Sequence, residues 1–193
     1  MDLNRLRDEA AECTQCGLHV GRVNPVFDKG NPDANVLVCG MCPAGEENKT
    51  GIPFIGRAGQ LLDQLLEASG FSLKNVYITN LVKCYLAAGK KLDQEWVQSC
   101  LPYLLVQISI LKPTVIITLG ADASNVLLGR EPGSIIGEIR GQIFEYAKDM
   151  YVIPTYHPSY LLRKGGIRSD IVPSVIENLK AAKNLELQYE RKL

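Results

Sequence analysis

The sequence has no net charge, because its 21 Lys and Arg residues are balanced by 21 Asp and Glu residues. Bulk charge therefore gives no sign of a nucleic-acid partner, although composition would not reveal a local basic patch. No apolar run comes near the length of a transmembrane helix, and residues 1–7 lack the apolar stretch of a secretory signal peptide. We therefore expect a cytoplasmic protein that does not enter a membrane.

Histidine is also scarce, since His19 and His157 are the only two. The six cysteines do not suggest a disulfide framework, because a cytoplasmic protein lies in a reducing compartment; metal binding or burial comes first. With 193 residues, 46% of them apolar and 22% charged, the chain is long enough to bury a core. There is no internal repeat and no linker, so we expect one domain over residues 1–193.

Short apolar runs predict five β-strands, at residues 36–39, 76–78, 115–119, 143–144 and 151–154. The run at 115–119 is almost wholly apolar, which is typical of a central parallel strand covered on both faces. Between the runs, amphipathic segments predict helices. Pro102 interrupts one of these segments, so we expect a kink or two separate helices there. The alternation predicts an α/β fold, a three-layer α/β/α sandwich with a central, largely parallel sheet of four to five strands.

The segment from Cys39 to Gly56 follows the first apolar run and precedes a long amphipathic helix. Its four glycines and two prolines indicate a tight, stiff loop. Open α/β sheets bind their ligands at the carboxyl ends of strands, where this loop would lie. Phe54 is a large ring in an otherwise small and polar segment. It either stacks on a planar ligand or folds back into the core.

Two polar residues, Asn80 and His157, follow two other predicted strands at the same end of the sheet. An amide and an imidazole can bind the edge of a flat heterocycle while an aromatic ring covers its face. The sequence therefore indicates a candidate pocket of Phe54, Asn80 and His157. The alternative interpretation is that each of the three is an isolated loop residue.

Four of the cysteines form a candidate ligand set. Cys13 and Cys16 make a C-x-x-C pair, and Cys84 and Cys100 stand at the ends of predicted elements. Four thiolates suit either zinc or an iron–sulfur cluster, and the spacing does not separate these two. Alternatively, Cys84 and Cys100 are simply small buried side chains.

Several motifs together resemble the family 4 uracil-DNA glycosylases, the iron–sulfur branch of the uracil-DNA glycosylase superfamily. They are the C-x-x-C, the loop ending G-I-P-F-I-G-R-A-G-Q-L-L, the stretch Y-I-T-N-L-V-K-C, Cys100 before Pro102-Tyr103, and H-P-S-Y-L-L-R. The resemblance spans nearly the whole chain. It implies a monofunctional enzyme that excises uracil from DNA in base excision repair, and it implies a [4Fe–4S] cluster. The implied cluster ligands are Cys13, Cys16, Cys84 and Cys100.

The same resemblance implies roles for the residues of the pocket. Phe54 would stack on a flipped-out uracil, Asn80 would bind the uracil edge, and His157 would hold the uracil O2 as negative charge builds on the leaving base. Uracil-containing DNA is the implied partner, and we expect a monomer. The residues expected to contact DNA follow the histidine: Ser159, Tyr160, Leu161, Leu162, Arg163 and Lys164.

One loop departs from the family pattern. The family usually reads G-E-A-P-G where this chain reads G-M-C-P-A, so Met41 replaces a glutamate thought to assist catalysis. We expect the attacking water to be held by backbone carbonyl groups of the loop and by Glu46 or Glu47. Two alternatives stay open: a glycosylase for hypoxanthine or xanthine, and an iron–sulfur DNA-binding protein without hydrolytic activity. Substrate contacts are expected from the loop residues Gly40, Met41, Cys42 and Pro43.

Overall fold

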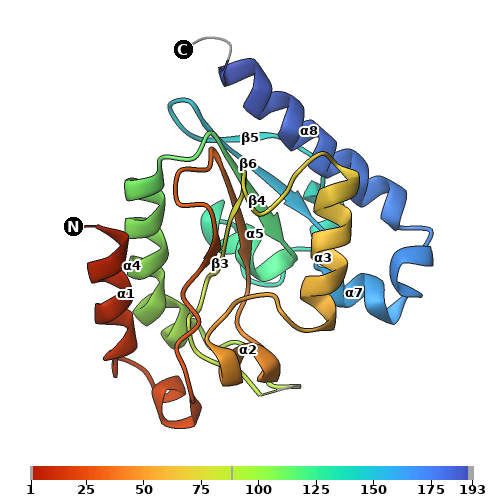
Figure 1. The fold of residues 1–193 in the computed structure, drawn as a ribbon. Coiled ribbons are helices and arrows are strands. Elements are labelled where there is room, and N and C mark those ends of the chain that lie inside the picture. The colour runs from red at the N-terminus through yellow and green to blue at the C-terminus, as the bar shows by residue number, and fades with distance from the viewer. Residues whose placement is uncertain (1, 88, 191–193) are drawn as a thin grey trace.

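The computed structural model of the protein describes residues 2–87 and 89–190, and a six-stranded sheet lies at its centre (Figure 1). In spatial order the strands run β1-β3-β2-β4-β6-β5. The four inner strands are parallel, and the two edge strands pair antiparallel with their neighbours. The predicted α/β class with a largely parallel sheet is therefore confirmed. The strands are β1 (Lys29–Gly30), β2 (Val36–Gly40), β3 (Tyr77–Asn80), β4 (Val115–Leu119), β5 (Phe144–Ala147) and β6 (Met150–Thr155).

The sheet has six strands where four to five were expected, because the two-residue β1 forms where no apolar run predicts a strand. Its Gly30 has a φ of 97°, and a Cβ at that position would lie 2.2 Å from the carbonyl oxygen of Val76. Only glycine fits so close to the neighbouring backbone. The pairing sets Lys29 opposite Ile78, at the edge of the sheet.

Helices cover both faces of the sheet and complete three layers (Figure 1). Alternate residues of β2 point to opposite faces. Val36 and Val38 pack in the core beneath α3, α7 and α8, whereas Leu37 and Cys39 pack in the core beneath α4 and α5. Helix α1 lies against the outer side of α4. These helices are α1 (Leu3–Ala11), α3 (Arg57–Ala68), α4 (Gln94–Leu111), α5 (Ala121–Leu127), α7 (Pro158–Arg163) and α8 (Val172–Glu190).

Helix α4 contains Pro102 in its interior and is one helix, so the expectation of two helices was wrong. Its N-terminus is capped by Asp93, whose side chain accepts the backbone N–H of Glu95 at 2.9 Å. Within the described part of the chain, none of the helices is both long and apolar enough to cross a membrane.

Four short helical segments complete the described chain. Helix α2 (Gly45–Thr50) lies inside the segment predicted to be a loop, directly after β2. The others are helix α6 (Ile136–Ile139) and two 3-10 turns, η1 (Gly17–Gly21) and η2 (Gly166–Arg168). The G-E-E-N-K-T sequence of α2 has no apolar periodicity, so nothing in its pattern marks it as a helix.

Candidate active site and cysteine pocket

Three parallel strands, β3, β2 and β6, end at the same edge of the sheet and bring the candidate residues to one place, which we call the Asn80 pocket. Strand β2 ends at Gly40 and β3 ends at Asn80, and these two residues are partners in the sheet. Strand β6 ends at Thr155, two residues before His157. Phe54 reaches the same place from the loop that follows β2. The pocket is lined by Cys42, Pro43, Ala44, Glu47, Phe54, Ala58, Asn80 and His157.

Gly40 allows the pocket side chains to come together. A Cβ at this position would lie 2.4 Å from Oδ1 of Asn80 and 2.5 Å from Cζ of Phe54. Both distances are far below van der Waals contact, so any larger residue would displace the amide and the ring. The absence of a side chain at residue 40 is therefore a requirement of the site.

Phe54 lines the pocket and also belongs to the core beneath α3, so the two interpretations of this ring are compatible. Its backbone has a φ of 53°, an uncommon conformation for a residue with a Cβ. Lys29 holds this conformation, because its Nζ donates to the carbonyl oxygen of Phe54 at 2.8 Å. A Cβ on Gly59 would lie 1.8 Å from the same oxygen. The ring centroid lies 5.9 Å from that of His157, with 35° between the ring planes.

Asn80 is the most deeply buried polar residue of the pocket, with 2% of its surface exposed. Among the described residues, none hydrogen-bonds to its Oδ1. A buried carbonyl oxygen without a donor costs on the order of 1–3 kcal/mol. An N–H group of a bound ligand would remove this cost.

His157 is held at the N-terminus of α7, where its Nδ1 accepts the backbone N–H of Ser159 at 3.1 Å. The hydroxyl of Ser159 lies 2.8 Å from the same nitrogen. Because a backbone N–H can only donate, Nδ1 has no proton of its own, and the proton of the neutral ring is on Nε2. Burial, assisted by the positive charge of Arg163, lowers the pKa of His157 to about 4. At neutral pH the ring is therefore an uncharged donor through Nε2.

The loop that replaces the usual acidic pattern contributes weakly polar side chains. The half-buried Met41 side chain packs against the core beneath α4, and its carbonyl oxygen accepts the N–H of Val82 at 2.9 Å. Cys42 lines the Asn80 pocket. Burial, with the negative charges of Asp122 and Glu47 adding to it, raises the pKa of the Cys42 thiol to about 12. The thiol is thus protonated at neutral pH and can act only as a weak donor or acceptor.

The two glutamates of α2 lie in different surroundings. Glu47 is buried and lines the pocket, and its carboxylate accepts the N–H groups of Ala44 at 2.9 Å and of Gly56 at 3.3 Å. It thereby ties the two ends of the loop together. Glu46 is exposed, and it pairs with Lys49 at 2.9 Å. Of the two glutamates expected to hold water, Glu47 is the one beside the pocket.

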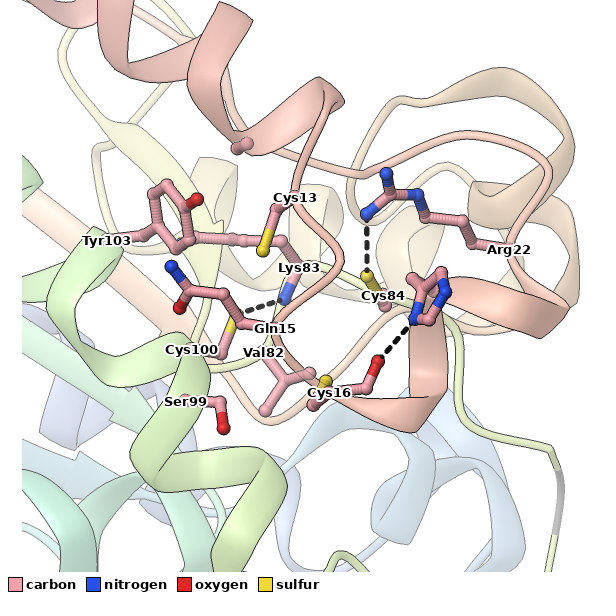
Figure 2. A pocket seen from close by; sticks show the side chains of 12 residues that line it. Cys13, Gln15, Cys16, Arg22, Val82, Lys83, Cys84, Ser99, Cys100 and Tyr103 are labelled. Atoms are coloured by element: carbon pink, nitrogen blue, oxygen red, sulfur yellow. Dashed lines mark hydrogen bonds between the residues drawn. The ribbon is translucent and has the colours of Figure 1, made fainter.

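The four candidate ligand cysteines line a second pocket, the cysteine pocket (Figure 2). Cys13 and Cys16 follow α1, Cys84 follows β3, and Cys100 lies in α4, so three distant segments meet here. Figure 2 shows the four side chains around one space, beside Tyr103. The other lining residues are Ala10, Gln15, His19, Arg22, Val82, Lys83 and Ser99.

Nitrogen donors point at two of the four sulfur atoms. Arg22 donates from Nη1 to Sγ of Cys84 at 3.5 Å, and the backbone N–H of Lys83 donates to Sγ of Cys100 at 3.2 Å (Figure 2). Burial raises the pKa of Cys100 to about 11, opposed by the nearby charge of Lys83. Over the described residues, no three His, Cys, Asp or Glu side chains close around a point suited to a single metal ion. Four thiols are a donor set that suits zinc or an iron–sulfur cluster.

The residues expected to contact DNA lie on and around α7, beside a larger groove that adjoins the Asn80 pocket. Both hollows are lined by His157, and Tyr160 lines the groove. Tyr160 stacks on Tyr156 with ring centroids 5.1 Å apart, and the charged groups of Arg163 and Lys164 each lie 5.9 Å from its centroid. The remaining expected residues divide by exposure: Ser159 and Leu162 are half-buried, whereas Leu161 is fully buried in the core.

Two lysines of the site were missed from the sequence. Lys29 binds the backbone of Phe54, and Lys83 binds the backbone of Asn80 at 2.6 Å. An isolated lysine in a sequence normally indicates a solvated surface, so neither carried a signal. Ser159 was expected to contact DNA, and its backbone N–H also orients His157. A capping side chain commonly accepts the N–H of the second residue after it, so this spacing was the signal for the contact.

The chain is similar to characterised proteins over most of its length. The family model described as the Uracil DNA glycosylase superfamily matches residues 27–180. The type-4 uracil-DNA glycosylase of Thermotoga maritima is 40% identical over 177 residues, which are 92% of this chain and 91% of that protein. The type-4 uracil-DNA glycosylase of Pyrobaculum aerophilum is 38% identical over 176 residues, 88% of this chain and 89% of that protein. The chain therefore belongs to the uracil-DNA glycosylase superfamily, in its type-4 branch.

Proposed function

We propose that the protein excises uracil from DNA by hydrolysing the bond between the base and deoxyribose. The observation that carries the proposal is the buried Oδ1 of Asn80, which lacks a donor among the described residues in a pocket shared with Phe54 and His157. Uracil has an N3–H that can donate to this oxygen, whereas N3 of cytosine has no hydrogen. Phe54 would cover the face of the flipped base. The pocket therefore favours uracil over cytosine.

His157 is suited to stabilise the departing base. When the C1′–N1 bond breaks, both bonding electrons stay with uracil, so negative charge grows on its oxygens. A hydrogen bond from Nε2–H of His157 to O2 becomes stronger as this charge grows, and it therefore lowers the barrier. The low pKa of His157 keeps the ring neutral, so this donor is available across the neutral range.

Water then adds to C1′ and releases a proton, which completes the hydrolysis. We propose Glu47 as the main holder of this water, because it lines the pocket and each oxygen has a lone pair beyond the one that accepts a backbone N–H. The carbonyl oxygens of Gly40, Met41 and Pro43 each also accept one backbone N–H and keep a second lone pair, so they can assist Glu47 in holding the water. Glu46 is the weaker candidate, since it is exposed and paired with Lys49.

We further propose that Cys13, Cys16, Cys84 and Cys100 hold a [4Fe–4S] cluster. The support is a set of four thiols from three segments, with N–H donors aimed at two of the sulfurs. When bound, the cluster would cross-link the loop after α1, the segment after β3 and helix α4.

The substrate would be uracil-containing DNA, bound along the groove beside α7 by a monomer. Arg163 and Lys164 would meet phosphates, and Ser159 would act near the backbone of the strand. Tyr160 and Leu162 are the large apolar residues of α7 that are only partly buried, so they would enter the duplex and fill the space of the flipped base. Leu161, being fully buried, would instead anchor the helix on the core.

A strand-cleavage assay tests the proposal. Duplex and single-stranded oligonucleotides that each contain one uracil, hypoxanthine or xanthine are incubated with the enzyme, and abasic sites are then cleaved with alkali. We expect the fastest cleavage at uracil and much slower cleavage with Asn80→Ala, which should bind DNA almost normally. Faster cleavage at hypoxanthine or xanthine would assign the other substrate class. Binding without any cleavage would identify a DNA-binding protein that does not hydrolyse.

A further inference from the structure

Lys83 is a buried lysine whose ammonium group is hydrogen-bonded by neutral oxygens and lies 5.5 Å from the centroid of the Phe27 ring. Only 2% of its surface is exposed, yet its Nζ donates three short hydrogen bonds. The acceptors are Oγ1 of Thr79 at 2.7 Å, the carbonyl oxygen of Asn80 at 2.6 Å and Oε1 of Gln107 at 2.6 Å. Three N–H groups and three acceptors match completely, so the ammonium group has one defined position. Burying a charge is costly unless it is fully hydrogen-bonded, and residue 83 is built to meet this condition.

The acceptor that matters for the chemistry is the carbonyl oxygen of Asn80. Oδ1 of Asn80 has no donor among the described residues, so hydrogen bonding to that atom does not fix the direction of the amide. Its orientation therefore depends on the position of its own backbone and on the close packing at Gly40. A charge-assisted hydrogen bond from Lys83 fixes that backbone at the point where β3 ends.

Lys83 also joins the end of β3 to the cysteine pocket. Its backbone N–H donates to Sγ of Cys100, and the next residue along the chain is Cys84. On its other side, a chain of hydrogen bonds runs from Gln107 in the core to the surface. Gln107 donates to the hydroxyl of Tyr77, which donates to Asp28, and Asp28 is paired with the exposed Arg7. One residue thus connects the end of β3, helix α4 and the cysteine pocket.

We propose that Lys83 is a positioning residue that orients Asn80 for reading the base. This inference rests on the proposed function, because it assumes that Asn80 binds the uracil edge. Lys83 need not touch the substrate; it acts through the backbone of Asn80. Removal of the ammonium group should therefore slow excision by allowing the amide to move, and this loss should disappear when the amide itself is absent.

The test is a double-mutant cycle on uracil excision, using Lys83→Met, Asn80→Ala and the double variant. Single-turnover rates are measured with enzyme in excess over an oligonucleotide that contains one uracil. Visible absorbance per protein and circular dichroism give the folded, metal-loaded fraction, to which each rate is normalised. We expect Lys83→Met to be slower than wild type by roughly 10- to 100-fold, the worth of a hydrogen bond to a charged group. In the Asn80→Ala background the same change should cost less than about 3-fold.

The inference would be overturned if Lys83→Met slowed excision by the same factor in the wild type and in Asn80→Ala, because Lys83 would then act independently of Asn80. If Asn80→Ala alone left excision unchanged, the proposed function would fail instead, so the two failures are distinguishable. Lys148→Met, in the turn between β5 and β6 at the opposite end of β6, controls for the loss of one positive charge and should keep the wild-type rate. If Lys83→Met fails to fold, Gln107→Leu can replace it in the cycle, because it removes one of the three acceptors of the ammonium group. Gln107→Leu should slow excision by a smaller factor, and this loss should again shrink in the Asn80→Ala background.

Discussion

The Asn80 pocket and the cysteine pocket lie at the two ends of the short segment from Asn80 to Cys84, and they are held in different ways. In the Asn80 pocket, protein groups fix nearly every part: Gly40 admits the amide and ring, Lys29 holds the backbone of Phe54, and Ser159 orients the imidazole ring. In the cysteine pocket, three segments bring four thiols around one space, and N–H donors of Arg22 and Lys83 reach two of the sulfur atoms.

This difference separates two kinds of preorganisation. The first pocket can hold its geometry from packing and hydrogen bonds of the protein alone, which is what a site complementary to a transition state requires. If the four thiols hold the proposed cluster, that cluster completes the second pocket, and the stability of the pocket is coupled to cluster binding. The two pockets should consequently respond differently to substitution, one through rate and the other through folding.

The largest effect is expected for Cys84→Ser and Cys100→Ser. Each removes one thiol from the cysteine pocket, so the protein should lose its brown colour, most of its iron and much of its soluble yield. Visible absorbance, iron analysis and thermal unfolding measure these losses. Cys42→Ala lies outside the cysteine pocket and should stay coloured. A colourless wild-type protein with one tightly bound zinc, purified without oxygen, would contradict the cluster assignment.

Gly40→Ala should have the opposite outcome to the cysteine variants. The protein should keep its colour but lose most of its rate of uracil excision. The new Cβ would displace Asn80 and Phe54, and a misplacement of about 1 Å can cost roughly 100-fold in rate. Single-turnover excision and iron content, measured on the same preparation, check both parts. Gly45→Ala is the matched control, because a Cβ at that glycine meets nothing within 4 Å. An active Gly40→Ala would show that the pocket is less tightly packed than described.

Substitutions of Met41, Glu46 and Glu47 should change the rate of uracil excision by a smaller factor. Glu47→Gln removes a carboxylate that binds two backbone N–H groups beside the pocket. We expect excision to slow by about 10-fold, less than the roughly 100-fold or more that general-base assistance typically supplies, because the cationic sugar is already a strong electrophile. Glu46→Gln should matter less, and Met41→Ala should change the rate little. Met41→Glu, which restores the usual acidic residue, should raise it. If neither glutamate affects single-turnover rates and Met41→Glu brings no gain, the water is held elsewhere.

The smallest effect is expected from pH on the contribution of His157 to the excision rate. Because the pKa of His157 is lowered to about 4, the ratio of the wild-type rate constant to that of His157→Gln should vary by less than about twofold from pH 5.5 to 8. The free energy of unfolding should instead change in the acid range. Below pH about 6.5 the His157 imidazole is protonated in the unfolded chain but not in the native one, so the native state loses stability as the pH falls toward 4. A step in the rate ratio near pH 6.5 would mean that the ring titrates normally.

The inner strands of the fold could be predicted because continuous apolar runs report burial on both faces. The run at residues 115–119 gave β4 directly. Strand β1 could not be predicted, since two residues carry no periodicity and Lys29–Gly30 becomes a strand only by pairing with β3. Helix α2 is similar: its polar sequence is folded by the contacts of Glu47 with the backbone and not by an apolar face.

The pocket residues could be identified because Phe54, Asn80 and His157 each follow a strand at the same end of the sheet. The residues that hold them could not. Lys29 and Lys83 act through main-chain oxygens, and the burial that gives them this role arises only when distant segments pack together. The adjacent Leu161 and Leu162 were indistinguishable for the same reason, because only the packing of α7 decides which one faces the core.

The placement of His157 at the start of α7 limits what evolution can put at that position. Nδ1 of the ring accepts a backbone N–H at the start of the helix, while the ring itself lines the pocket. Asp, Asn and Ser are the usual residues at helix starts, but their side chains are too short to serve both edges of such a span. A selection for activity from a library randomised at this one codon should therefore return histidine, whereas a selection for folding alone should also return these shorter residues.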